Sequence, residues 1–154
     1  MKPVVSYLSR VLVIAILSSC QSAKNSSPAD GTGAAGTAEG ITEKYWKLTE
    51  LRGKAVPVFE GPGREPHFIL KNQDNRLSGS GGCNRLMGGY ELQPNNRIRF
   101  TKVASTRMAC PDMTVEQEFM QVLNTADSYV QKGDTLILNR ARIAPLARFV
   151  AVYF

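Results

Sequence analysis

The side chains in this chain that could do chemistry are few, since it contains three cysteines and one histidine. Cys83 and Cys110 lie in the part of the chain that is rich enough in apolar residues to fold. A pair of thiols can form a disulfide, bind a metal or act as nucleophiles. There is no Cys-x-x-Cys spacing, and no second histidine or group of carboxylates accompanies His67. We therefore expect no metal site and no cofactor.

Four polar residues flank these two cysteines in the sequence: Asn84, Arg85, Thr106 and Arg107. A bond between the cysteines would bring all four together in space. In the simpler interpretation, Asn84 and Thr106 form hydrogen bonds with the backbone of the loops. In the alternative interpretation, the four residues form a small patch that binds an anion or a carboxylate.

The third cysteine ends a segment typical of an export signal. A positively charged start precedes the apolar run Val11–Leu17, and two serines and Cys20 follow it. The run is far shorter than the roughly 20 residues of a transmembrane helix. Leu-Ser-Ser-Cys resembles the bacterial lipobox, in which the cysteine is acylated by palmitate or a similar fatty acid. We expect a lipoprotein signal peptide over residues 1–19, cut before Cys20; the alternative is an ordinary signal with a chance cysteine.

Residues 20–41 consist mainly of Ser, Gly, Ala and Thr and contain no aromatic residue, so we interpret them as a lipidated cysteine followed by a flexible linker. Gln21 follows the cysteine in place of the Asp that retains enterobacterial lipoproteins in the inner membrane. We therefore expect a lipid anchor in the outer membrane, facing the periplasm. Disulfides persist in that compartment, which favours a Cys83–Cys110 bond over free or reactive thiols.

The formal net charge of +6 is spread along the chain, without a run of five or more basic residues. This scatter indicates a solvated, mildly basic surface, and we expect no nucleic-acid partner. The alternative is that the basic residues attract anionic lipid nearby.

The remaining residues, 42–154, have the pattern of one small β-rich domain. Short segments with β-forming or alternating residues are separated by turn residues. We expect about eight strands in this region. They cover residues 45–51, 66–71, 76–80, 89–93, 97–101, 127–132, 135–139 and 145–154.

One amphipathic pattern between the fifth and sixth of these strands predicts an α-helix. Val115, Phe119, Val122 and Leu123 share one helical face. Thr114 would cap the helix, with Gln117 completing a capping box. We expect a mostly β (α+β) domain in which a small antiparallel, curved sheet or barrel-like structure packs against this helix.

Several of these segments resemble the META domain, also called the heat shock protein HslJ family. Gly82-Cys83-Asn84-Arg85 and Gly88-Gly89-Tyr90 resemble its first signature, and Thr106–Cys110 with Glu116 and Phe119 on the helix resembles its second. Trp46-Lys47-Leu48 and the segment 133–138 complete a resemblance over about residues 43–154.

The resemblance implies a β-rich, barrel-like domain with a helix, a Cys83–Cys110 bond and no established enzymatic activity. Members are exported or lipid-anchored envelope proteins linked to heat shock, drug tolerance or motility. The fold is also similar to that of secretion pilotins, which bind lipid or the tail of a partner protein.

We therefore expect a monomeric, non-enzymatic lipoprotein that acts in envelope stress tolerance or as a chaperone-like binding module, with an envelope protein or lipid as partner. One alternative is a carrier of lipid or hydrophobic peptide, which predicts a large apolar pocket. Another is an unrecognised hydrolase or redox enzyme, which requires a reactive thiol or an acid/base pair.

Overall fold

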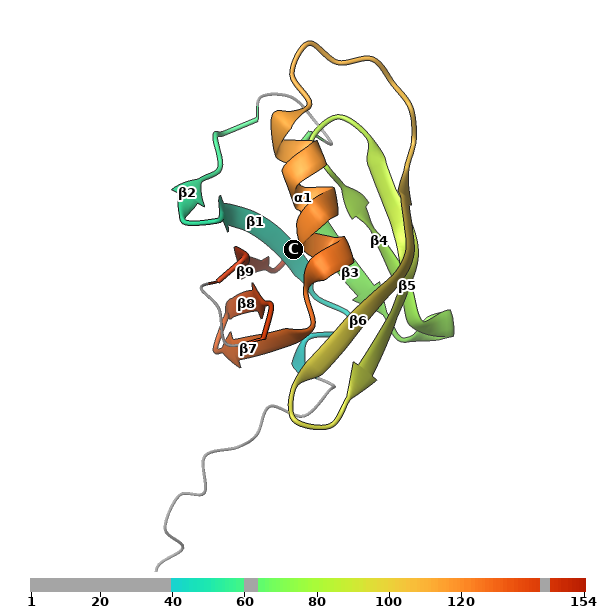
Figure 1. Cartoon of the computed structure of the whole chain (residues 1–154), viewed down its shortest axis with the longest axis vertical. Coiled ribbons are helices and arrows are strands. Elements are labelled where there is room, and N and C mark those ends of the chain that lie inside the picture. Colours follow the sequence, from blue (N-terminus) through green and yellow to red (C-terminus); the bar gives the residue numbers. More distant parts are fainter. Residues whose placement is uncertain (1–39, 60–63, 142–144) are drawn as a thin grey trace, which may run out of the picture. The chain divides into compact units, whose positions relative to one another are not determined.

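The computed structural model describes residues 40–59, 64–141 and 145–154, and the structural statements below refer to these ranges (Figure 1). The expected signal peptide 1–19, Cys20 and most of the linker lie outside the described residues.

The described residues form nine strands, one α-helix and one 3-10 turn. In chain order these are β1 (Tyr45–Leu51), β2 (Lys54–Ala55), β3 (His67–Lys71), η2 (Gln73–Asn75), β4 (Arg76–Ser80), β5 (Arg85–Gln93), β6 (Arg97–Ser105), α1 (Thr114–Thr125), β7 (Ser128–Lys132), β8 (Thr135–Asn139) and β9 (Ala147–Val152). All pairings are antiparallel, and the strand order is β2-β1-β3-β4-β5-β6-β7-β8-β9. A further pairing between β1 and β9 closes the sheet into a ring.

The inner face of this ring holds the hydrophobic core. Alternate residues of β1, β3 and β9 point inward, as the two-residue period of a strand requires. Trp46, Phe68 and Phe149 are each 0% exposed. The indole Nε1 of Trp46 donates a hydrogen bond to the carbonyl of Ile41 at 2.8 Å, so its polar atom is satisfied although it is buried. Burying a large apolar side chain stabilises a fold by about 1.5–3 kcal/mol, so each of these rings contributes to the stability of the domain.

Helix α1 packs its apolar face against the same core, beside β6 and β1. Phe119 is 0% exposed, and the centre of its ring lies 5.8 Å from that of Phe149 and 6.5 Å from that of Phe68. Val122 and Leu123 are buried on the same face. The predicted helical face is therefore confirmed.

The mostly β fold with a single helix among the described residues is confirmed, but three details differ from the prediction. β5 begins at Arg85 instead of residue 89, β6 continues to Ser105 instead of 101, and β2 was not predicted. Because β2 adds one strand, α1 follows the sixth strand of the structure. The full length of the β5–β6 pair was not predicted because its register shifts near Gly88. Such a bulge breaks the alternation on which strand prediction depends.

The predicted capping box at α1 is wrong. The N-cap residue is Met113, without a side-chain hydrogen bond, and Thr114 is the first residue of the helix. Asp112 supplies the acceptor instead, since its Oδ1 receives the backbone N–H of Thr114 at 2.8 Å. This bond lowers the pKa of the Asp112 carboxyl. The described part of the chain contains no helix long and apolar enough to cross a membrane.

Candidate functional site

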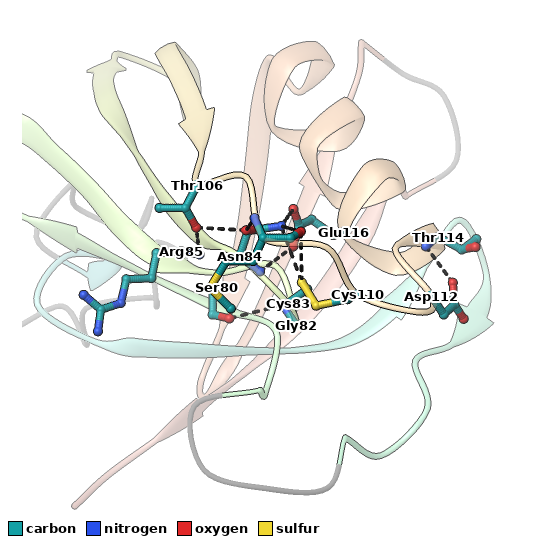
Figure 2. The surroundings of a disulfide bond; sticks show 11 residues. Ser80, Gly82, Cys83, Asn84, Arg85, Thr106, Cys110, Asp112, Thr114 and Glu116 are labelled. Carbon is teal, nitrogen blue, oxygen red and sulfur yellow. Dashed lines mark hydrogen bonds between the residues drawn. A yellow bond between two sulfur atoms is a disulfide. The ribbon is translucent and has the colours of Figure 1, made fainter.

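The two cysteines that the sequence singled out meet at one end of β4. Cys83 lies in the short loop between β4 and β5, and Cys110 lies in the connection from β6 to α1 (Figure 2). The structure joins them in a disulfide with 6.2 Å between their Cα atoms. Both residues are half-buried. The bond ties the start of the α1 connection to the end of β4.

Asn84, beside this disulfide, is the centre of a buried hydrogen-bond network. The residue is 0% exposed. Its Oδ1 accepts the hydroxyl of Thr106 at 2.9 Å and the backbone N–H of Met108 at 2.7 Å. Its Nδ2 donates to Oε1 of Glu116 at 2.9 Å and to the carbonyl of Met108 at 3.4 Å. One side chain therefore joins the β4–β5 loop, the β6–α1 connection and the helix.

Glu116 completes this network and is the residue whose role sequence reasoning missed. It is only 3% exposed, and its Oε2 accepts the backbone N–H of Asn84 at 2.7 Å. Its side chain also explains why residue 81 is a glycine, since a Cβ at that position would lie 2.5 Å from Cγ of Glu116. The sequence marks Glu116 only by the family resemblance and by its place in the first turn of the expected helix. Its burial could have been predicted from its position on the helix, since it lies three residues before Phe119 and therefore on the same, buried face.

The four polar residues flanking the cysteines divide into two groups. Thr106 joins Asn84 in the network, and its hydroxyl also accepts the backbone N–H of Arg85 at 3.1 Å. The side chain of Arg85 is exposed and points away from Asn84 in Figure 2. Arg107 is exposed as well, and neither arginine side chain has an ion-pair or hydrogen-bond partner among the described residues. Binding of an anion by the two arginines stays a prediction.

The opposite end of β4 carries a different arrangement, which we call the polar groove. It has a volume of about 500 Å³ and lies between the β3–β4 turn and the outer end of β5. Its lining includes Asn72, Asn75, Tyr90, Leu92 and Gln93.

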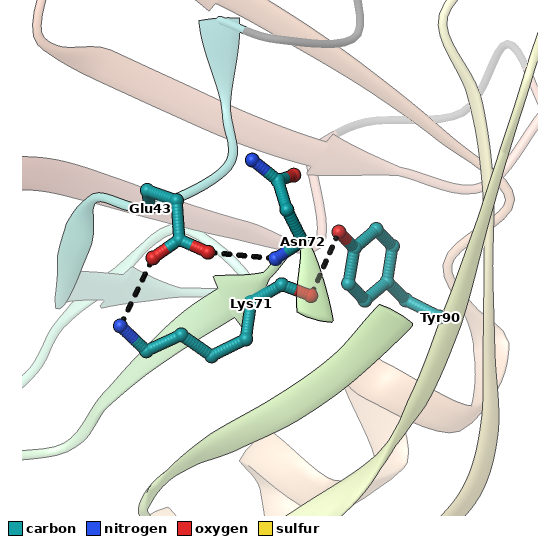
Figure 3. Close-up of polar contacts among 4 residues, drawn as sticks. All are labelled: Glu43, Lys71, Asn72 and Tyr90. Carbon is teal, nitrogen blue, oxygen red and sulfur yellow. Dashed lines mark hydrogen bonds and ion pairs between the residues drawn. The ribbon is translucent and has the colours of Figure 1, made fainter. Parts of the chain in front are cut away.

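The wall of the polar groove is held by one side chain from the segment before β1 and one from β5 itself (Figure 3). Oε1 of Glu43 accepts the backbone N–H of Asn72 at 2.7 Å, and its Oε2 accepts Nζ of Lys71 at 3.0 Å. The hydrogen bond from Asn72 is the main reason why the pKa of Glu43 lies below its usual value. The hydroxyl of Tyr90 donates to the carbonyl of Lys71 at 3.2 Å. The backbone at this turn is therefore satisfied by Glu43 and Tyr90, while the carboxamide of Asn72 takes part in none of these bonds.

His67 has a packing role in the structure. Its ring stacks on Tyr45 with 4.2 Å between centroids, and its Nδ1 lies 2.7 Å from the carbonyl oxygen of Glu65. Burial lowers the pKa of His67. No group of three or more histidine, cysteine or acidic side chains able to hold a metal ion occurs within the described ranges.

The family follows from comparison with known domains. A family model of the META domain matches residues 39–153, which is most of the chain. The chain belongs to the META domain family. The predicted resemblance is confirmed. Of the residues in the two META signatures, the two cysteines, Asn84, Thr106 and Glu116 form the disulfide network described above.

Solved structures share the fold of this META domain. A protein from Burkholderia xenovorans solved by NMR has a TM-score of 0.58 at 22% identity, covering 74% of this chain and 85% of that chain. A second protein solved by NMR has a TM-score of 0.58 at 21% identity, covering 74% and 93%. A crystal structure of a DUF4847 family protein from Bacteroides vulgatus has a TM-score of 0.51 at 14% identity, covering 73% and 94%. At these identities the similarity shows the fold alone.

No curated protein matches this META-family chain at a significant level.

Proposed function

We propose that this META-family protein is a non-enzymatic binding module held at the bacterial cell envelope by acyl chains on Cys20. The observation that carries the proposal is the Cys83–Cys110 disulfide. Disulfides persist in oxidising compartments such as the periplasm, so the bond is what an exported domain would have. The lipobox-like residues before Cys20 and membership of the META family support an envelope-associated role.

The chemistry around the disulfide supports binding in preference to catalysis. A redox or nucleophilic enzyme would need a thiolate that is free to react. Both sulfurs are bonded to each other here, and the carboxylate of Glu116 accepts two hydrogen bonds from Asn84. The acidic and polar groups at this end of the sheet are therefore engaged in holding the loops together.

The packing of the interior counts against the alternative of a lipid or hydrophobic-peptide carrier. Such a carrier needs a large apolar cavity. The rings of Phe68, Phe119 and Phe149 meet inside the sheet, with centroids 4.8 to 6.5 Å apart. The polar groove, at about 500 Å³, lies outside this core, and its lining includes the polar side chains of Asn72, Asn75 and Gln93. We therefore place the binding activity on the surface of the domain.

The lipid anchor is tested by feeding cells an alkynyl palmitate analogue and fractionating their membranes. We expect the wild-type chain to be labelled and to sediment with the outer membrane, whereas Cys20→Ala should be unlabelled and soluble. The double variant Cys83→Ala/Cys110→Ala is the matched control, because it changes two cysteines and should keep the label. A wild-type chain found unlabelled in the cytoplasm, with all three thiols reactive, would overturn the proposal.

A role in envelope stress tolerance is the finer part of the proposal. A strain that lacks the gene should survive a heat shift less well than its parent, and the wild-type gene should restore survival. Because the proposed role requires anchoring, the gene encoding Cys20→Ala should restore it poorly. Equal survival of all four strains would contradict a stress role.

A further inference from the structure

We propose that the polar groove binds a neutral, hydroxyl-rich sugar chain. This inference deepens the proposed binding role and rests on it, because the envelope is where such a domain would meet glycans. The juxtaposition that carries it is a set of three carboxamide side chains, from Asn72, Asn75 and Gln93, around one surface groove.

The size of the groove suits a small part of a sugar chain. Its volume is about 500 Å³, and small-molecule sites commonly measure about 300–1,000 Å³. The residues that line it come from the β3–β4 turn, from the end of β5 and, with Thr42, from the segment before β1. The antiparallel pairing of β4 with β5 brings the first two of these segments next to each other.

The carboxamides give the groove the hydrogen-bonding character of a sugar site. Asn72, Asn75 and Gln93 are exposed, and their amide groups form no hydrogen bond with other described residues. A carboxamide has an oxygen that accepts and an NH₂ group that donates. A sugar hydroxyl also both donates and accepts, so neighbouring hydroxyls can pair with each amide through both of its atoms. Half-buried Leu92 adds an apolar contact for the C–H face of a sugar ring.

The charges around the groove are already paired, which favours a neutral ligand. Arg99 binds the carboxylate of Glu91 through its Nη2 at 2.8 and 2.9 Å. Lys71 pairs with Glu43 at 3.0 Å on the other side. These side chains neutralise one another. Within the described residues, the groove therefore has no cluster of unpaired cations to bind a phosphate and no cluster of unpaired carboxylates to bind a basic ligand.

The groove is rigid where the amides project from it. Glu43 holds the backbone N–H of Asn72 at 2.7 Å, and Tyr90, which is 4% exposed, holds the carbonyl of Lys71. Both contacts are visible in Figure 3. A ligand that binds to side chains on a fixed backbone orders little of the protein, so a shallow polar site can still give measurable affinity.

The test is calorimetric titration of the purified full-length protein with three neutral probes: chitotetraose, maltotetraose and cellotetraose. Chitotetraose represents the N-acetylated glycans of the cell wall, and the other two represent unsubstituted glucans. We expect at least one probe to bind. Asn72→Ala and Gln93→Ala should each weaken it about fivefold, which corresponds to losing one net hydrogen bond.

Matched controls separate the groove from the rest of the molecule. Gln117→Ala removes an exposed carboxamide from α1, and Arg85→Ala removes an exposed side chain at the disulfide end; both should bind like the wild type. The proposal is overturned if none of the probes binds at about 10 mM, or if binding is unchanged in both groove variants. It is also overturned if Arg85→Ala abolishes binding of the probe, because the site would then lie at the disulfide end.

The titration does not depend on the lipid anchor, so the two proposals can fail separately. If the chain binds a sugar but is never acylated, the proposed envelope location is wrong and the proposed sugar site stands. If the chain is acylated but binds no sugar, the proposed sugar site is wrong and the envelope location stands.

Discussion

The two ends of β4 are both rich in polar side chains, yet they use them in opposite ways. At the end near Ser80, Asn84 and Glu116 are buried, and each hydrogen-bonding atom faces another atom of the protein. At the end near Arg76, the amides of Asn72 and Gln93 face solvent, on a backbone that other residues hold. Figure 1 shows the β4–β5 loop and the β3–β4 turn at opposite ends of these strands.

Burial explains this difference. A buried polar atom without a partner costs about 1–3 kcal/mol, so the disulfide end is stable only if its polar atoms are all paired. An exposed amide bonds to water and can exchange that water for a ligand at little cost. The first arrangement stabilises the structure, and the second leaves side chains available for binding.

The disulfide should give the largest effect on stability. Cys83 and Cys110 are 27 residues apart, and closing a loop of that length stabilises a fold by roughly 3–4 kcal/mol. We expect Cys83→Ala/Cys110→Ala to lose about that much free energy of unfolding in urea. A loss below about 1 kcal/mol would show that the disulfide end does not hold the domain together.

Asn84→Ala should come next. It removes the side-chain Nδ2 that donates to the buried carboxylate of Glu116. If the loop then relaxes, the backbone N–H of residue 84 is lost as a second donor. We expect a loss of about 2–3 kcal/mol in urea unfolding. The neighbouring variant Arg85→Ala changes an exposed side chain and should stay within about 0.5 kcal/mol. Similar losses in both variants would contradict the assignment of Asn84 as the centre of the network.

The groove end should respond to acid through Glu43. Its pKa is lowered mainly by the backbone N–H of Asn72, so the folded state favours the ionised carboxylate. The stability from this contact is therefore complete above the unfolded pKa and is lost as the pH falls through the lower, folded pKa. We expect the amide NMR signal of Asn72 to titrate with a midpoint below 4.5, and Glu43→Gln to abolish the titration. A midpoint at or above 4.5 would mean that this contact does not hold the turn.

The smallest effects should come from the amides of the groove. Asn72→Ala and Gln93→Ala remove exposed carboxamides that form no hydrogen bond with a described residue, so the free energy of unfolding should change by less than about 0.5 kcal/mol. Urea unfolding of these two variants and of Asn84→Ala under the same conditions compares their free energies of unfolding directly. A loss of about 2 kcal/mol in either variant would show that the groove is a structural element like the disulfide end.

Much of the fold could be predicted because its signals are local. The alternation of buried and exposed residues in β1 and β6 can be recognised within one short stretch of sequence, and so can the apolar face of α1. The start of β5 could not be predicted in the same way, since the bulge near Gly88 interrupts the alternation. The helix cap was missed because the helix begins at Thr114 itself, which makes Met113 the N-cap residue and leaves Asp112 to accept the backbone N–H of Thr114.

The candidate sites could be predicted only where residues are neighbours in the sequence. Asn84 and Thr106 were found because each lies close to a cysteine. Glu116 looked like an ordinary acidic residue in the first turn of a helix, and only the packing of α1 brings it to Asn84. The polar groove gave no local signal at all, because its amides come from the β3–β4 turn and β5 and meet only when the sheet forms.

The central claim is that one end of β4 holds the fold while the other binds, and amide hydrogen exchange of the full-length protein measures both at once. With a bound neutral tetrasaccharide, the account predicts added protection at residues 72–75 and 90–93 and unchanged exchange at 83–85 and 106–110. Added protection at the disulfide end, with none at the groove, would contradict it.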